Sequence, residues 1–237
     1  SSGAIGIPFL LAIATIAYAW LARKPVYMLP QTIGPLRRRW EFALLRWLIP
    51  KLRVVLLRDE NSLALLKNAG IEHSRCYLVP DIAFLFQGAP ATEGRALVAE
   101  QTLNSALPRP LLGITMINWG AQNRRYTGQA AYEAAVARTI EFFIRQYDGT
   151  VLLFPQVHGP TQNEDDRIPA HRVRAQVEQF GGRVFVVARE VSPAQLKAAY
   201  GQMDLFIGTR LHSNIFALTE AVPVIAIAYQ SKTRGVM

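Results

Sequence analysis

The sequence contains a single cysteine, Cys76, among 237 residues. One cysteine excludes an internal disulfide, so nothing in the sequence indicates an oxidising compartment. It also excludes paired-cysteine motifs such as CxxC, which hold metals or carry out redox chemistry. Cys76 opens the apolar run "CYLV", and we interpret it as a small buried hydrophobic residue.

Acidic residues are scarce: 17 Asp and Glu stand against 26 Lys and Arg, giving a formal net charge of +9. The excess favours anionic partners, namely phosphate, carboxylate, nucleic acid or an anionic membrane surface. A generally basic surface without a specific ligand explains it equally well. The basic run "RRRW" at 37–40 lacks interleaved aromatic residues, which argues against nucleic-acid binding. The sequence also lacks a P-loop and a nucleophile elbow.

The first 22 residues carry no charge, which raises the question of a membrane segment. Pro8 suits the start of a helix and Arg23 follows its end, leaving roughly 16 helical residues, about 24 Å. A bilayer core needs about 30 Å. We therefore expect a buried helix packed on a sheet, with a membrane-inserted segment as the alternative. No positive region precedes the run, which argues against a signal peptide.

Short continuous apolar runs recur along the chain and are typical of strands covered on both faces. They are "VYML" (26–29), "VVLL" (54–57), "CYLV" (76–79), "LLGITMI" (111–117), "VLLF" (151–154), "VFVV" (184–187), "LFI" (205–207) and "VIAIA" (224–228).

Helical patterns lie between most of these runs. Residues 129–147 carry an apolar stripe at helical spacing, and Ser192-Pro193 is typical of an N-cap followed by proline at the first helical position. Residues 38–49 and 62–69 also predict helices. The alternation predicts an α/β fold with doubly wound parallel sheets.

A stretch rich in Gly, Pro, Ser and Thr interrupts the alternation at 86–110, with a short helix at 95–103 as an option within it. We therefore predict two Rossmann-like domains facing a cleft, residues 1–90 and 111–237, joined by a linker at 91–110. The chain begins without Met and stops soon after a strand-like run, so we expect a fragment that is truncated at both ends.

Ligands of open α/β sheets bind at the carboxyl ends of the strands. Polar residues that directly follow the predicted strands are therefore site candidates. They are Gln31, Thr32, Arg58, Asp59, Asp81, Asn118, Gln156, His158, Gly208, Thr209, Arg210 and His212.

Several of these candidates also have a purely structural interpretation. Asp59 is a candidate helix cap with Arg58 as its ion-pair partner. Asp81 suits an Asx turn, and Asn118 suits a simple turn. His158 precedes Gly-Pro and suits a connecting loop.

The stretch "GTRLHS" at 208–213 gives the most specific pattern. Gly208 permits a tight turn, and Thr209 or Ser213 is a candidate cap for the following helix. Arg210 and His212 would then lie at a helix N-terminus, which attracts anions. Arginine binds carboxylate or phosphate with two hydrogen bonds, and histidine transfers protons near neutral pH. A capped turn with a surface ion pair is the alternative.

The acidic stretch "EDD" at 164–166 offers too few clustered oxygens for a metal site, so we expect no metal. A solvated loop is the simplest interpretation, and a helix cap or a contact to a sugar is the functional alternative.

Together the motifs "LPQTIGP", "LRDENSLALLKNAGI", "VPDIAF", "LFPQVHGP" and "DLFIGTRLHSNIFALTEAVPVIAIAYQSKTRG" resemble the polysaccharide pyruvyl transferase family. The resemblance runs from about residue 26 to the end. It implies a GT-B-like fold and an enzyme that transfers pyruvate from phosphoenolpyruvate onto a glycan as a cyclic ketal. It implies no metal and no organic cofactor.

The resemblance also implies roles for individual residues. Arg210 and His212 match the family's "RLH" motif as catalytic candidates. We expect the donor to contact Arg210, Leu211, Gly208 and Arg58. We expect the acceptor, a glycan that is free or lipid-linked, to contact Gln31, Thr32, Gln156, His158 and Asp165. The implied location is the cytoplasm, with the inner face of the cell membrane as a second option.

Three competing hypotheses stay open. A glycosyltransferase or sugar epimerase with this fold would use a nucleotide sugar, with Glu220 gripping the ribose. A non-catalytic protein would bind an anionic membrane through its basic surface and apolar amino-terminal run. Lastly, the fragment would be inactive if activity needs segments outside it.

Overall fold

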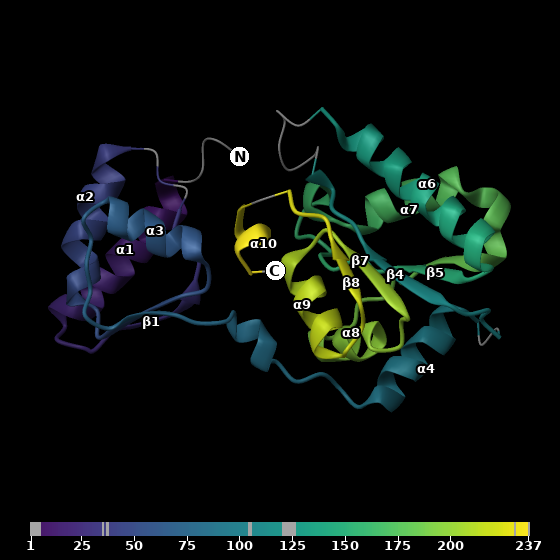
Figure 1. Cartoon of the computed structure of the whole chain (residues 1–237), viewed down its shortest axis with the longest axis horizontal. Coiled ribbons are helices and arrows are strands. Elements are labelled where there is room, and N and C mark those ends of the chain that lie inside the picture. Colours follow the sequence, from purple (N-terminus) through teal and green to yellow (C-terminus); the bar gives the residue numbers. More distant parts are fainter. Residues whose placement is uncertain are drawn as a thin grey trace. The chain divides into compact units, whose positions relative to one another are not determined.

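The computed structural model describes residues 6–34, 36, 38–103, 106–119, 127–229 and 231–236. The chain divides into two compact units (Figure 1). Unit 1 comprises Ser1–Phe84 with Ala228–Met237, and unit 2 comprises Leu85–Ile227. Each unit contains one parallel sheet, and each of the eight predicted strands is present.

Unit 1 is built on a sheet of three parallel strands in the order β1-β2-β3. The strands are β1 (Tyr27–Gln31), β2 (Val54–Leu57) and β3 (Cys76–Leu78). The helices are α1 (Gly6–Leu21), α2 (Arg39–Leu48), α3 (Glu60–Asn68) and α10 (Ser231–Val236), with short 3-10 turns at Ile49–Lys51 and Ile82–Leu85. The core joins Met28, Val55 and Leu57 of the sheet to apolar side chains of the helices.

Helix α1 confirms the predicted helix but not its predicted burial. Ile13 is its buried side chain, and Phe9 and Ile16 pack partly against the core. Leu11 and Tyr18, in contrast, are 63% and 75% exposed. The helix is apolar all round, whereas unit 1 covers one face of it. Within the part of the chain that the structure describes, no helix has the length and apolar character to cross a membrane.

Unit 2 is built on five parallel strands in the order β6-β5-β4-β7-β8. They are β4 (Leu111–Thr115), β5 (Thr150–Leu153), β6 (Val184–Val186), β7 (Leu205–Gly208) and β8 (Val224–Ala226). The helices are α4 (Ala91–Gln101), α6 (Gln129–Tyr147), α7 (Arg167–Gln176), α8 (Pro193–Tyr200) and α9 (Leu211–Thr219), with 3-10 turns at Gln162–Glu164 and Glu178–Arg183. The chain runs outward from β4 to β6 and returns to β7 beside β4, so the topological switch point lies between β4 and β7.

The predicted linker at 91–110 differs from the structure. Helix α4 occupies 91–101 and packs on α8 inside unit 2. Gly94 makes this packing close, because a Cβ there would lie 2.2 Å from the backbone oxygen of Ala198. The glycine that suggested a flexible linker is therefore a helix-packing residue. Residues 228–237, predicted as part of the second domain, belong to unit 1.

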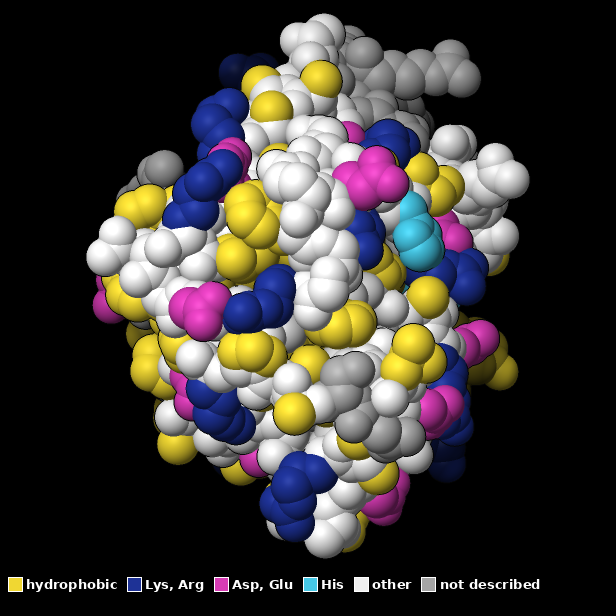
Figure 2. All heavy atoms as spheres, turned by 90° about the vertical axis from the view of Figure 1, so that its right-hand side faces the viewer, with side chains coloured by type: hydrophobic (Ala, Val, Ile, Leu, Met, Phe, Trp, Pro, Cys, Tyr) yellow, Lys and Arg dark blue, Asp and Glu magenta, His cyan; other side chains and the backbone are white. Residues whose placement is uncertain are grey.

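The face of unit 2 shown in Figure 2 carries Lys and Arg side chains interspersed with Asp and Glu. Such mixing produces no large field of one sign on that face. The excess positive charge of the chain is therefore not concentrated there.

Candidate functional site

The carboxyl ends of β4 and β7 form the switch point of unit 2, where ligands of open α/β sheets bind. The two strands are joined there by hydrogen bonds. The N–H of Thr209 donates to the oxygen of Thr115 at 3.2 Å, and the hydroxyls of Thr115 and Ser213 lie 2.8 Å apart. The backbone that follows β7 is thus fixed to β4 before it enters α9.

The last residue of β7 is Gly208, and a neighbouring side chain leaves no room there for a Cβ. An added Cβ would lie 1.6 Å from Oδ1 of Asn214, a fully buried residue of α9. The side-chain amide of Asn214 donates to the oxygen of Gly208 at 3.2 Å. This contact locks the turn between β7 and α9.

The N-cap residue of α9 is Arg210, and its side chain makes no capping hydrogen bond. The prediction of Thr209 or Ser213 as the cap is wrong. The Thr209 hydroxyl lies 2.7 Å from that of Tyr132, and the Ser213 hydroxyl donates backward to the oxygen of Arg210 at 2.7 Å. Both hydroxyls are used to hold the turn, and the positive end of the helix dipole is left available to an anion.

Arg210 and Asp166 form the central ion pair of the site. Asp166 is fully buried and accepts from Nε of Arg210 at 3.1 Å and from Nη2 at 2.6 Å. The Asp166 carboxylate also accepts from the N–H of Val157 at 3.1 Å. Burial raises the pKa of Asp166, and the Arg210 guanidinium opposes that shift. Among the described residues no acceptor bonds Nη1 of Arg210, which leaves a cationic edge for a ligand.

His212 lies in the first turn of α9 with its side chain exposed, while the neighbouring Leu211 is buried in the core. The exposed imidazole therefore lies at the positive end of the helix dipole, on the solvent side. Leu211 offers a ligand its backbone rather than its side chain.

The loop from Pro155 to Asp166 brings two of the five predicted acceptor residues together. His158 and Asp165 form an isolated antiparallel bridge, and Nε2 of His158 lies 3.2 Å from the oxygen of Pro155. Asp165 accepts from Nη2 of Arg167 at 2.6 Å, and this partner lowers its pKa. In the stretch at 164–166, Glu164 is exposed, as a solvated loop predicts, whereas Asp165 and Asp166 are held by hydrogen bonds. The described residues contain no cluster of His, Cys, Asp or Glu suited to a metal ion.

Gln156 differs from its neighbours because its side-chain oxygen is buried without a hydrogen-bond partner among the described residues. A buried acceptor of this kind costs free energy unless a donor reaches it. A hydroxyl of a bound sugar is one such donor.

Asn118, which follows β4, is more than a turn residue. Its side-chain amide donates to the oxygen of Gln162 at 3.3 Å, and its Oδ1 lies 3.5 Å from Nη2 of Arg172. Arg172 in turn pairs with the buried Glu133 of α6 at 2.5 Å. Asn118 therefore ties the loop of the acceptor candidates to α6 and α7.

Two residues of this site carried little signal in the sequence. Asp166 lies in the stretch at 164–166, but its neighbour Asp165 was the predicted site residue. Tyr132 was part of the apolar stripe of α6. Burial raises the pKa of Tyr132 to about 12, so it keeps its proton and remains a hydrogen-bonding partner of Thr209.

Unit 1 has a second polar cluster, at the carboxyl ends of β1 and β2. Arg58 pairs with Asp81 rather than with the predicted Asp59, because the parallel strands β2 and β3 end side by side. Nε of Arg58 donates to the Thr32 hydroxyl at 3.0 Å, and that hydroxyl donates to Asp59 at 2.7 Å.

The remaining structural predictions for this cluster are confirmed. Asp59 is the N-cap of α3 and accepts from the N–H of Ser62 at 2.8 Å. Asp81 accepts from the N–H of Ala83 at 2.9 Å, as an Asx turn does. Gln31 is exposed at the end of β1.

Of the basic run at 37–40, Arg37 lies outside the described residues, and Arg38 precedes α2 as its N-cap.

An open groove of about 890 Å³ lies beside this cluster. It is lined within unit 1 by Arg58, Asp59, Asn61, Pro80, Asp81 and Gly235, among others. Because Arg58 is paired with the buried Asp81, the groove offers a ligand hydrogen bonds more than net charge.

Comparisons with known proteins concern the family and the fold of the chain. The model of the polysaccharide pyruvyl transferase family matches residues 3–231. The amylovoran biosynthesis protein AmsJ of Erwinia amylovora is 28% identical over 221 residues, which is 92% of this chain and 52% of that protein. The chain thus spans about half the length of that relative.

Solved structures show the same fold at low identity. The UDP-GlcNAc 2-epimerase of Methanocaldococcus jannaschii matches with a TM-score of 0.63 at 12% identity, over 93% of this chain and 59% of that one. The S. aureus MnaA–UDP structure matches with a TM-score of 0.54 at 10% identity, over 92% and 54%. These similarities confirm the predicted GT-B-like α/β fold.

Proposed function

Because the chain belongs to the polysaccharide pyruvyl transferase family, we propose that it transfers pyruvate from phosphoenolpyruvate to a sugar. The acceptor is part of a cell-surface polysaccharide or its precursor, and the product is a cyclic ketal. The observation that carries the proposal is the N-terminus of α9. Arg210 is the N-cap residue there, but its side chain makes no capping hydrogen bond. We assign the reaction to the cytoplasm.

The donor carries a carboxylate and a phosphate, so it needs several compensating partners. The Arg210–Asp166 pair is close to neutral as a unit, and the full charge of the guanidinium is not available. We therefore assign the donor to the positive end of α9, the Nη1 edge of Arg210 and the backbone at Gly208 and Leu211. Arg58 is a weaker candidate, since Asp81 neutralises it.

The reaction balances without a cofactor. A proton adds to the methylene carbon of phosphoenolpyruvate, and one sugar hydroxyl attacks the adjacent carbon. The C–O bond to phosphate breaks, and a neighbouring hydroxyl forms the second C–O bond of the ketal. The two hydroxyls release two protons in total. One of them balances the proton that was added to the methylene carbon, and the other goes to phosphate. No metal or organic cofactor is required.

His212 is the group we assign to proton transfer, because it is exposed in the first turn of α9 and histidine is the side chain most often used for general acid–base catalysis. Its place in the first turn of α9 sets it beside an anion bound at that helix end. We assign acceptor contacts in unit 2 to His158, Asp165 and the unpartnered oxygen of Gln156.

A set of variants tests these roles. His212→Ala should lower turnover with donor binding largely intact, and His171→Ala, which removes an exposed histidine on α7, is the matched control. Arg210→Ala should weaken donor binding strongly. It also leaves Asp166 buried without its partner, so the double variant Arg210→Gln/Asp166→Asn is needed beside it. That pair keeps hydrogen bonding without charge, and it should stay folded while binding phosphoenolpyruvate poorly. Wild-type turnover in these variants would rule out the assignment.

The fold similarity to a UDP-GlcNAc 2-epimerase in complex with UDP-GlcNAc and UDP favours one second candidate, an enzyme acting on a nucleotide sugar. Glu220, the residue expected to grip a ribose, is the C-cap of α9 and lies 3.5 Å from the buried Lys197. It is thus at the opposite end of α9 from Arg210. Thermal shift with phosphoenolpyruvate against UDP and GDP sugars separates the two candidates.

A further inference from the structure

Unit 1 carries a basic aromatic patch at the amino edge of its sheet. It consists of Trp20, Leu21, Arg23, Lys24, Lys51 and Arg53, which line a shallow pocket of about 480 Å³. Four of these residues are cations, and the described residues that line the pocket include no acid. The acidic side chains of this part of the chain lie in other segments, at Glu41, Asp59, Glu60, Glu72 and Asp81.

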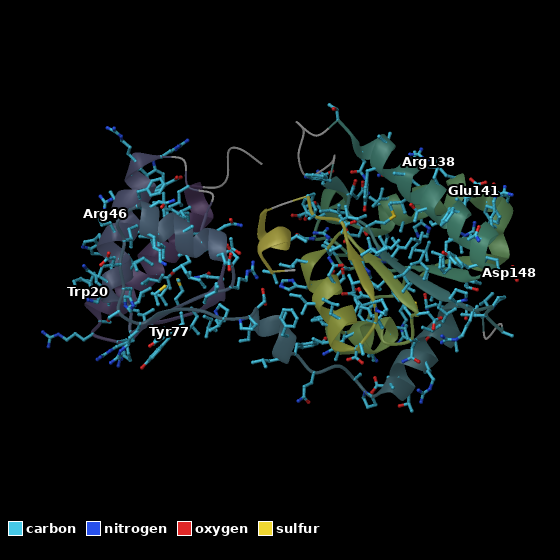
Figure 3. All side chains as sticks on the ribbon, viewed as in Figure 1. Trp20, Arg46, Tyr77, Arg138, Glu141 and Asp148 are labelled. Carbon is cyan, nitrogen blue, oxygen red and sulfur yellow. The ribbon has the colours of Figure 1, made fainter. Side chains whose placement is uncertain are left out.

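Trp20 of the patch packs against Trp47 of α2, which lies beside the patch. The rings of Trp20 and Trp47 meet edge to face with centroids 5.8 Å apart. Lys51 lies 5.0 Å above Trp20 and 4.6 Å above Trp47. Both tryptophans remain about two-fifths exposed, at 40% and 42%. Figure 3 labels Trp20 where α1 ends and the chain turns toward β1.

Exposed apolar side chains continue from the patch along α1. Leu21 is 71% exposed and Tyr18 is 75% exposed. Tryptophan and tyrosine beside Lys and Arg are the residues that proteins place at the membrane–water interface. Apolar side chains enter the headgroup region there while the cations meet anionic lipid.

We propose that the basic aromatic patch docks unit 1 on an anionic lipid surface. Charge complementarity selects this partner, because an anionic lipid surface attracts clustered Lys and Arg side chains. The absence of a membrane-spanning helix in the described residues is consistent with docking at the surface. The proposal does not depend on the function assigned above.

The position of the patch is compatible with an active enzyme. Lys24 and Arg53 precede β1 and β2, whereas Thr32 and Arg58 follow them. Docking through the amino edge of the sheet therefore leaves the polar cluster at the carboxyl edge accessible.

Vesicle flotation tests the proposal. The whole chain is mixed with phosphatidylcholine vesicles that contain or lack phosphatidylglycerol, at low and high ionic strength. The protein should float with the anionic vesicles at low salt and remain behind with the neutral ones. Lys24→Glu/Arg53→Glu should lower partitioning at least about 30-fold, since each interfacial cation contributes about fivefold and the introduced carboxylates add repulsion.

Matched variants in unit 2 control for net charge and hydrophobicity. Arg95→Glu/Arg138→Glu makes the same change in charge at exposed positions of α4 and α6, and it should bind almost as wild type. Tyr18→Ser/Leu21→Ser should also lose binding, while Leu103→Ser/Phe142→Ser, at other exposed apolar positions, should retain it.

Two outcomes would overturn the proposal. Equal losses in the patch variants and their controls would show only a dependence on net charge. The second outcome would come from sedimentation equilibrium, which measures the oligomeric state. A wild-type dimer that dissociates in the patch variants, without vesicle binding, would assign the surface to a second copy of the chain.

Discussion

Arg210→Gln is the perturbation that probes the architecture of the site most directly. It removes the cation from a carboxylate that is fully buried, whereas the Arg210 side chain is itself 18% exposed. Breaking a buried pair by removing one partner costs about 3–5 kcal/mol. Because Asp166 keeps the Val157 N–H as a donor, we expect the lower end, about 3 kcal/mol at neutral pH.

The two partners should not be equivalent. Burial raises the pKa of Asp166 even with Arg210 present, so a neutral side chain is tolerated at this position. Asp166→Asn leaves a partly exposed arginine and should cost about 1–2 kcal/mol. The double variant should recover most of the loss of Arg210→Gln, because neither remaining side chain is charged.

The pH dependence has a defined sign. A carboxyl group with a raised folded-state pKa binds its proton more tightly in the folded chain than in the unfolded one. Its contribution to stability is complete below the unfolded pKa and is lost as the pH rises through the folded pKa. Removing Arg210 raises the folded pKa further, so Arg210→Gln should regain stability on acidification by about 1.4 kcal/mol per pH unit within that window.

Hydrogen exchange of the amides in β4 and β7 measures the free energy of opening of unit 2 by itself. Glu141→Gln, which breaks the exposed pair with Arg145 on α6, is the control and should cost under about 0.5 kcal/mol. If Arg210→Gln costs no more than this control, or if Asp166→Asn fails to rescue it, the account of a buried, desolvated pair is wrong.

Three further predictions concern single features. Gly94→Ala should lower the free energy of unfolding of unit 2 by about 3 kcal/mol or more in urea titrations, since its Cβ would meet the backbone of α8 at 2.2 Å. Tyr132→Phe should leave Thr209 without its hydroxyl partner and cost about 1 kcal/mol in the same titrations, because the Tyr132 pKa of about 12 keeps the hydroxyl protonated. Asp165 has a pKa lowered by Arg167, so its stabilisation is present above the unfolded pKa and lost as the pH falls through the folded one. Asp165→Asn should remove this loss of stability at low pH, which thermal melts recorded below neutral pH would measure.

The sequence predicted the features that depend on local pattern. Apolar runs marked every strand, and the helical stripe at 129–147 gave the bounds of α6. Ser192-Pro193 predicted the start of α8, where Ser192 forms a capping box with Gln195. These signals are local because turn chemistry and helical periodicity act within a few residues.

Pairings across the sheet could not be predicted in the same way. Asp59 was the nearest acid to Arg58 in the sequence, but neighbouring strands bring Asp81 to it instead. Asp166 and Asp165 are adjacent in sequence, yet one faces Arg210 inside the unit and the other faces Arg167. Which acid turns inward depends on how the loop is folded against α9. The sequence likewise cannot distinguish a glycine in a linker from a glycine at a close contact between helices. Gly94 lies at such a contact.

A transfer assay tests the central claim most directly. The chain is incubated with phosphoenolpyruvate and a panel of glycan acceptors, and phosphate release and the mass of each glycan are followed together. We predict that phosphate and a pyruvyl ketal form in equal amounts, and that both are lost in the His212→Ala variant but not in His171→Ala. Consumption of a nucleotide sugar without any turnover of phosphoenolpyruvate would contradict the account.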